Sequence, residues 1–122
     1  MALTTADFAS TILTYKLVAE TGTNTTPLID VTGGSGKLYA MHLDNTSNAV
    51  VYVKFAFTTT VVTVGTTAND MMIKIPASTV KDITMPDGIA FTNLSFWAVA
   101  EAKDNSSNAV ASNQVRVHLV AS

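Results

Sequence analysis

Hydrophobic and polar residues alternate within Gly36–Phe57, where two runs of strand-favouring residues flank a short polar segment. In the second run one face is entirely apolar, and its residues are Val51, Val53, Phe55 and Phe57. A period of two is what a half-buried strand requires. Residues 44–48, between the runs, are typical turn formers. The pattern therefore predicts a β-hairpin at the centre of a sheet.

Similar patterns predict further strands on both sides of this hairpin. They span residues 12–19, 28–31, 71–75, 79–85, 94–101 and 113–120. Leu94–Glu101 is apolar on both faces, which predicts a strand buried on one side and covered on the other. Pro86-Asp87-Gly88 is a strong turn signal, because proline presets one corner and glycine permits positive φ. With about eight strands, the chain is predicted to be an all-β, single-domain antiparallel β-sandwich, jelly-roll or immunoglobulin-like.

Two segments lie outside this strand pattern. Residues 1–11 are expected to form a short helical turn, from Thr4 to Phe8, or an arm that reaches a neighbouring chain, whereas residues 12–122 form the β-sandwich domain. Thr58–Asp70 is rich in threonine, and we interpret it as a long loop. Long ordered loops in compact domains are often interaction surfaces.

The low content of charge leans towards a subunit of a larger assembly, although a sparsely charged monomer is equally compatible with it. Only 13% of the 122 residues are charged, about half the usual fraction, so a neighbour can cover the surface without dehydrating many ions. The net charge of −2 and the absence of a basic patch argue against a nucleic-acid partner. The chain has no cysteine, which excludes disulfides and thiolate chemistry. We expect no secretory signal. No apolar run approaches the roughly 20 residues of a membrane helix, so no membrane partner is predicted.

The histidines are the only candidates for acid–base or metal chemistry near neutral pH. His42 and Asp44 share one face of a strand and would supply half of a metal site, but no further ligand pattern accompanies them. We interpret His42 as a residue near a strand end, and His118, beside Arg116, as part of a solvated face. The chain lacks a nucleophile elbow and an acidic pair, and its glycine-rich turn Thr32–Gly36 lacks phosphate-loop spacing. We therefore expect no enzyme activity, no cofactor, and no catalytic, cofactor-binding or metal site.

Four aromatic residues keep a carbohydrate-binding module open as an alternative. A sugar-stacking platform would use Trp97, Tyr39, Tyr52 and Phe96. These rings lie in the most apolar strands, however, so burial in the core or in a subunit contact is the favoured interpretation. The aspartates at strand ends lack calcium-loop spacing and are interpreted as turn residues.

Several local motifs occur in order between residues 31 and 100. They are Gly36-x-Leu38-Tyr39, His42-Leu43-Asp44-Asn45, Asn48-Ala49, Val64-Gly65-Thr66-Thr67-Ala68-Asn69-Asp70, Ile75-Pro76-Ala77 and Pro86-Asp87-Gly88-Ile89-Ala90-Phe91. With these motifs the chain resembles small all-β virion proteins encoded beside the head and tail genes of tailed bacteriophages. The motifs are turn and strand patterns and include no catalytic residue.

The resemblance implies a structural subunit of the capsid decoration (cement) type, which binds and stabilises the outer surface of the phage head. Its partners would be the major capsid protein or other virion proteins, and its location the virion, after synthesis in the host cytoplasm. A tail- or fibre-associated subunit is the alternative. We expect a symmetric homo-oligomer, with a trimer favoured, and contacts through residues 1–11 and Thr58–Asp70.

Overall fold

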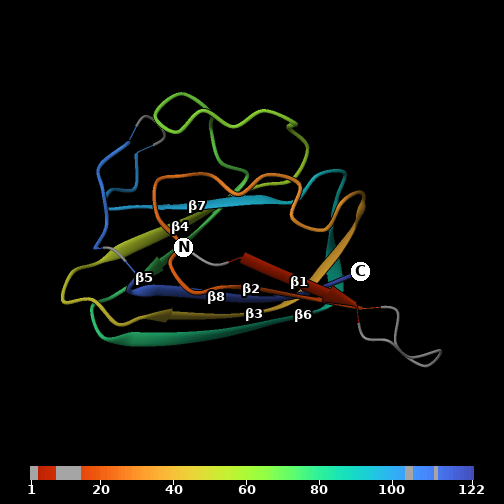
Figure 1. Ribbon diagram of the computed structural model, residues 1–122, viewed down its shortest axis with the longest axis horizontal. Coiled ribbons are helices and arrows are strands. Elements are labelled where there is room, and N and C mark those ends of the chain that lie inside the picture. Colours follow the sequence, from red (N-terminus) through yellow and green to blue (C-terminus); the bar gives the residue numbers. More distant parts are fainter. Residues whose placement is uncertain (1–2, 8–14, 104–105, 112) are drawn as a thin grey trace.

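The computed structural model describes residues 3–7, 15–103, 106–111 and 113–122, which form two facing antiparallel sheets and contain no helix (Figure 1). One sheet has five strands in the order β1-β2-β8-β3-β6, and the other has three in the order β5-β4-β7. The strands are β1 (Leu3–Asp7), β2 (Lys16–Glu20), β3 (Gly36–Asn45), β4 (Val51–Ala56), β5 (Met71–Ile75), β6 (Thr79–Phe91), β7 (Ser95–Val99) and β8 (Val115–Ala121). The predicted all-β sandwich is confirmed.

The strands pair in a nested order. β2 pairs with β8, β3 with β6, and β4 with β5. Residues 24–31 run beside β7, where Leu28 and Phe96 exchange two backbone hydrogen bonds with N···O distances of 2.9 and 3.0 Å. From β2 onward, the first segment therefore pairs with the last, the second with the second-last, and so on inward. This nested pairing is the jelly-roll topology.

The segment beside β7 corrects one predicted strand. The strand expected at 28–31 is reduced to the single bridge at Leu28. Asp30 adopts a φ of 50°, a left-handed conformation that interrupts an extended strand. The irregular segment still covers the edge of the three-stranded sheet, which leaves that edge less open to pairing with another chain.

The core lies between the sheets and follows the predicted alternation. Inward-facing side chains from both sheets are fully buried, including Leu38, Leu43, Val53, Phe55, Val117 and Leu119. Burial of each such side chain stabilises the fold by roughly 1.5–3 kcal/mol. The apolar faces predicted for the second run of Gly36–Phe57 and for residues 113–120 are those that form this core.

The predicted hairpin within Gly36–Phe57 is wrong, because β3 lies in the five-stranded sheet and β4 in the three-stranded sheet. The buried side chain of Asn45 explains the difference. Its Nδ2 donates to the carbonyl oxygens of Ile75 and Pro76, each at 3.1 Å, and its Oδ1 accepts a hydrogen bond from the Ser47 backbone at 3.0 Å. The amide thereby ties the turn to the end of β5, so the turn is an arch between the two layers.

The N-terminal segment also differs from expectation. Leu3–Asp7 is a strand that pairs antiparallel with β2, so the helical turn predicted from Thr4 does not form there. Thr5 also contacts the segment between β2 and β3, its hydroxyl donating to the Val31 carbonyl oxygen at 2.9 Å. Phe8 and the first residues of the predicted strand 12–19 lie outside the described residues.

The predicted turn at Pro86-Asp87-Gly88 is a bulge inside β6, which continues from Thr79 to Phe91. The β3–β6 register shifts at Tyr39, so that residues 85–88 stand opposite this one residue. Gly88 has a φ of 74°, and a Cβ atom added there would lie 2.8 Å from the Tyr39 ring. The turn-forming residues therefore bulge out of strand β6, while β6 pairs with β3 both before and after the bulge.

Candidate functional site

The two histidines of the chain lie side by side on the outer face of the five-stranded sheet. His42 of β3 stands opposite His118 of β8 in the strand register, and their ring centroids are 5.9 Å apart. On its other side His42 stands opposite Asp82 of β6, whose Oδ1 contacts Nδ1 of His42. Three ionisable side chains from three neighbouring strands therefore form one row across the sheet.

An open groove of about 170 Å³ follows this row. Its lining includes both imidazole rings and Asp82, together with the small side chain of Ala40. The side chains of His42 and Asp82 are 45% and 70% exposed. A small ligand can therefore reach these groups from solvent without any rearrangement of the core.

The predicted pairing of His42 with Asp44 is only partly what the structure contains. Asp44 follows on the same strand face, but it stands opposite Arg116 in the register, and the carboxylate that contacts His42 belongs to Asp82. His118 is partly buried against His42 rather than fully solvated. In the described part of the chain, no three His, Asp or Glu side chains are placed to hold a metal ion together.

The four aromatic residues considered as a sugar platform do not form one shared surface. Phe96 and Trp97 are consecutive in β7 and therefore point to opposite faces, and both are buried, Trp97 being 1% exposed. Tyr39 lies in the other sheet, where its ring packs edge-on against Tyr15 at 5.2 Å. Tyr52 packs with Trp97 in a small apolar cluster. The burial of Trp97 and Phe96 leaves neither ring face free to stack on a sugar.

Thr58–Asp70 forms an ordered cover over the outer face of the three-stranded sheet, arching above β7 in Figure 1. Val62 is buried there against Trp97, and Val64 packs on the same cluster. At the base, Oδ2 of Asp70 accepts a hydrogen bond from the Phe57 backbone at 2.8 Å. The predicted long loop is therefore a folded excursion, anchored by its side chains to the sheet beneath.

A second segment, of which residues 100–103 and 106–108 are described, covers the same face and encloses a lysine. Lys54 stands opposite Trp97 in the β4–β7 register and is 1% exposed. Its Nζ donates to the carbonyl oxygen of Lys103. Strand alternation placed Lys54 on the outer face, but no local pattern indicated that the Lys103 carbonyl would meet its amine there.

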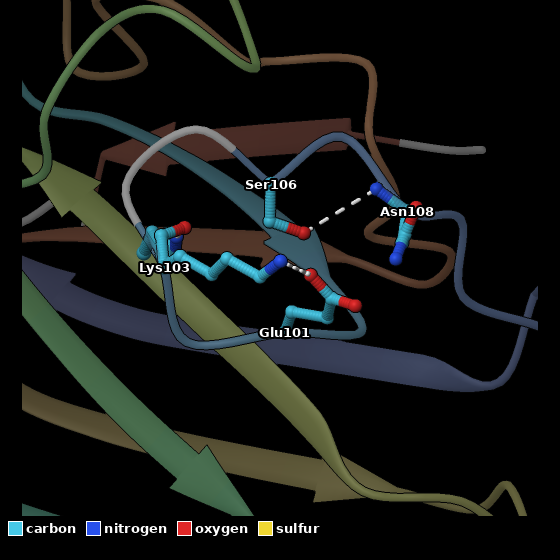
Figure 2. Close-up of polar contacts among 5 residues, drawn as sticks. Glu101, Lys103, Ser106 and Asn108 are labelled. Carbon is cyan, nitrogen blue, oxygen red and sulfur yellow. Dashed lines mark hydrogen bonds and ion pairs between the residues drawn. The ribbon is translucent and has the colours of Figure 1, made fainter.

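This second cover is held by short-range polar contacts, which Figure 2 shows. The carboxylate of Glu101 lies 3.3 Å from Nζ of Lys103 in a surface ion pair, and the hydroxyl of Ser106 accepts a hydrogen bond from the Asn108 backbone at 3.4 Å. The backbone of Ala100 donates to the Asn108 carbonyl at 3.0 Å. These contacts, with the bond from Ser106 N to the Lys103 carbonyl, hold residues 101–103 and 106–108 beside Lys54.

The comparisons with known proteins leave the family resemblance as a prediction. No protein-family model matches the chain, and no curated protein or solved structure matches it. The expectations of no enzyme activity and no cofactor likewise stay predictions. Along the residues that the structure describes, no helix has the length and apolar character needed to cross a membrane.

Proposed function

We propose that the protein is a structural subunit of a bacteriophage virion, of the capsid decoration type, and that the Thr58–Asp70 excursion binds the outer surface of the head. The character of this excursion carries the proposal. Residues 58–69 contain no charged side chain, the base is anchored through Asp70, and Val61 is 67% exposed at the surface. An anchored, uncharged and partly apolar surface is suited to a protein partner.

The absence of charge matters because burial of an ionised group without a partner is costly. A threonine-rich surface can instead be covered while its hydroxyl groups exchange water for polar groups of the neighbour. The motif resemblance to phage virion proteins supplies the identity of the partner, the major capsid protein. A symmetric homo-oligomer, with a trimer favoured, would present several copies of the excursion to one lattice.

The jelly-roll topology supports the proposal as an analogy alone, since the same topology occurs in viral capsid and lectin domains. Of these two classes, the lectin-like function is the less favoured, because Trp97 is buried. A decoration subunit needs no pocket for its role. It binds the assembled shell and not the separate capsid subunits, and by mass action it stabilises the assembled state.

The contact predicted for residues 1–11 cannot be tested by deleting them. Leu3–Asp7 is part of the five-stranded sheet, so deletion of this strand would expose the edge of β2 and disturb the fold. A deletion is therefore a poor test of a contact, and a point substitution in the excursion is a better one.

The proposal is tested with Val61→Lys, which places a charge in the proposed contact. Val80→Lys is the matched control, because Val80 is 49% exposed on β6 of the other sheet. Heads of a phage that carries this gene, prepared without the protein, are mixed with the purified chain, and the bound protein is measured after sedimentation. The unchanged chain is expected to saturate the heads and raise the temperature at which they release DNA. Val61→Lys should lower the bound fraction at least tenfold, and Val80→Lys should leave it unchanged.

Failure of the unchanged chain to sediment with heads would contradict the proposal. Sedimentation with tails alone would assign the chain to the tail instead. Equal binding by the Val61→Lys and unchanged chains would exclude the excursion as the contact.

A further inference from the structure

We propose that His42 and His118 form a binding site for a transition-metal ion of the zinc or copper type, with Asp82 as the positioning residue for His42. The site lies on the outer face of the five-stranded sheet, whereas the excursion covers the outer face of the other sheet. The metal site is therefore independent of the proposed contact with the phage head.

The separation of the two rings fits a shared ion. With zinc about 2.0–2.1 Å from each histidine nitrogen that binds it, the centroids of two such rings lie roughly 5 Å apart at the tetrahedral angle and approach about 6.5 Å as the angle at the metal opens. The centroids of His42 and His118 are 5.9 Å apart. Because the two residues are directly opposite on paired strands, the backbone of β3 and β8 holds this separation.

Asp82 determines which nitrogen of His42 is available. Its carboxylate contacts Nδ1 of His42, so the neutral ring carries its proton on that nitrogen and keeps the lone pair on Nε2. A carboxylate behind a ligating histidine is the usual arrangement at metal sites, where it fixes ring orientation and raises the basicity of the ligand. The His42–Asp82 contact is thus already of the kind that a bound metal requires.

The surroundings leave room for an ion and its water molecules. The groove is open to solvent, and Ala40 on β3 adds little bulk beside the rings. Of the neighbouring charges, Asp44 stands opposite Arg116, so an acidic residue accompanies the arginine of β8. Water would complete the coordination, because the described residues offer no third protein ligand.

The donor set indicates the class of ion. Imidazole nitrogen suits zinc, copper and nickel, whereas calcium and magnesium require several oxygen ligands. Among divalent first-row ions, copper binds nitrogen sites more tightly than nickel or zinc. With two protein ligands, the site is expected to exchange its ion readily.

The test uses the full chain without a histidine tag. Equilibrium dialysis against zinc chloride or copper chloride is expected to give one ion per chain, with copper bound more tightly, and no binding of magnesium. His42→Ala and His118→Ala should each weaken zinc binding at least tenfold. In NMR spectra, copper should broaden the imidazole signals of both histidines together.

Asp82→Asn tests the positioning role, and loss of such a partner weakens metal binding by about 10–100-fold. Asp44→Asn is the matched control, because it removes the same charge from the same face without touching His42, and it should change the affinity less than twofold. Trp97 fluorescence reports folding from the other sheet in every variant. Absence of zinc and copper binding by the unchanged chain would overturn the proposal, as would unchanged binding by His118→Ala. Equal losses in Asp82→Asn and Asp44→Asn would overturn the role of Asp82.

Discussion

The outer faces of the two sheets differ in what covers them. Over the three-stranded sheet, two of the chain's own segments close above Trp97 and Lys54, which are almost fully buried. The outer face of the five-stranded sheet keeps His42 and Asp82 in an open groove. The inner faces of both sheets supply apolar side chains to one core. The comparison teaches that stability should be concentrated beneath the covers, while groups free to bind a ligand remain on the open face.

The largest effect is expected beneath the cover. Trp97→Ala should lower the free energy of unfolding by about 3–5 kcal/mol, because it empties the space between the three-stranded sheet and the excursion. Urea denaturation followed by circular dichroism measures the change, since the variant lacks the only tryptophan. A loss below about 1 kcal/mol would mean that the cover is loosely packed and that the two faces differ little.

Lys54 separates packing from hydrogen bonding beneath the same cover. Lys54→Ala should cost about 2–4 kcal/mol, because both the buried stem and the hydrogen bond to the Lys103 carbonyl are lost. Lys54→Met keeps most of the stem, so its cost should fall to about 1–2 kcal/mol, the part due to the amine. Denaturant unfolding of both variants gives the difference. Equal costs would show that the stem contributes no packing energy.

Gly88 gives a smaller effect within the five-stranded sheet. Gly88→Ala should cost about 2–3 kcal/mol, because the new methyl group combines a positive φ with a contact 2.8 Å from the Tyr39 ring. Gly33→Ala is the matched control: its φ is also 74°, but no atom lies within 4 Å of the added group. The control should cost about 1 kcal/mol, as for backbone strain alone. Thermal unfolding of both variants tests whether the bulge is tightly packed. Equal losses of stability in the two variants would show that the contact with Tyr39 adds nothing to the backbone strain.

The smallest effect is expected on the open face. Without metal, His42→Ala and His118→Ala should each change the free energy of unfolding by no more than about 0.5 kcal/mol, because neither ring is buried in the core. The same denaturant titration serves as the measurement. A loss above about 1 kcal/mol in either variant would show that the open face contributes to stability and would remove the contrast between the sheets.

The buried faces of single strands could be predicted from the sequence, because side-chain direction repeats every second residue. This local rule identified the inner faces of β4 and β8. The two apolar faces of Leu94–Glu101 predicted a strand that is covered on its outer side, and β7 is fully buried. Composition alone, with few charges and no cysteine, placed no limit on which strands pair.

Strand partners could not be predicted, since they depend on contacts between residues far apart in the sequence. The local pattern predicts a hairpin turn between β3 and β4, because the contact from the Asn45 amide to Ile75 that makes it an arch lies outside that pattern. The His42–His118 row depends in the same way on the register of β3, β6 and β8. The sequence identified the individual histidines as candidates, but it could not predict that they lie next to each other on one face of the sheet.

The nested pairing of the strands has a consequence for the order in which the protein can fold during synthesis. β8 lies between β2 and β3, so the centre of the five-stranded sheet stays unfilled until Val115–Ala121 has left the ribosome. Until then β2 and β3 present unpaired edges, which can capture strands from other nascent chains. Closure of a sheet that joins such distant segments is expected to take milliseconds to seconds, as in other all-β proteins. Less frequent initiation of synthesis, which leaves fewer unfinished chains present at one time, should therefore raise the yield of folded protein.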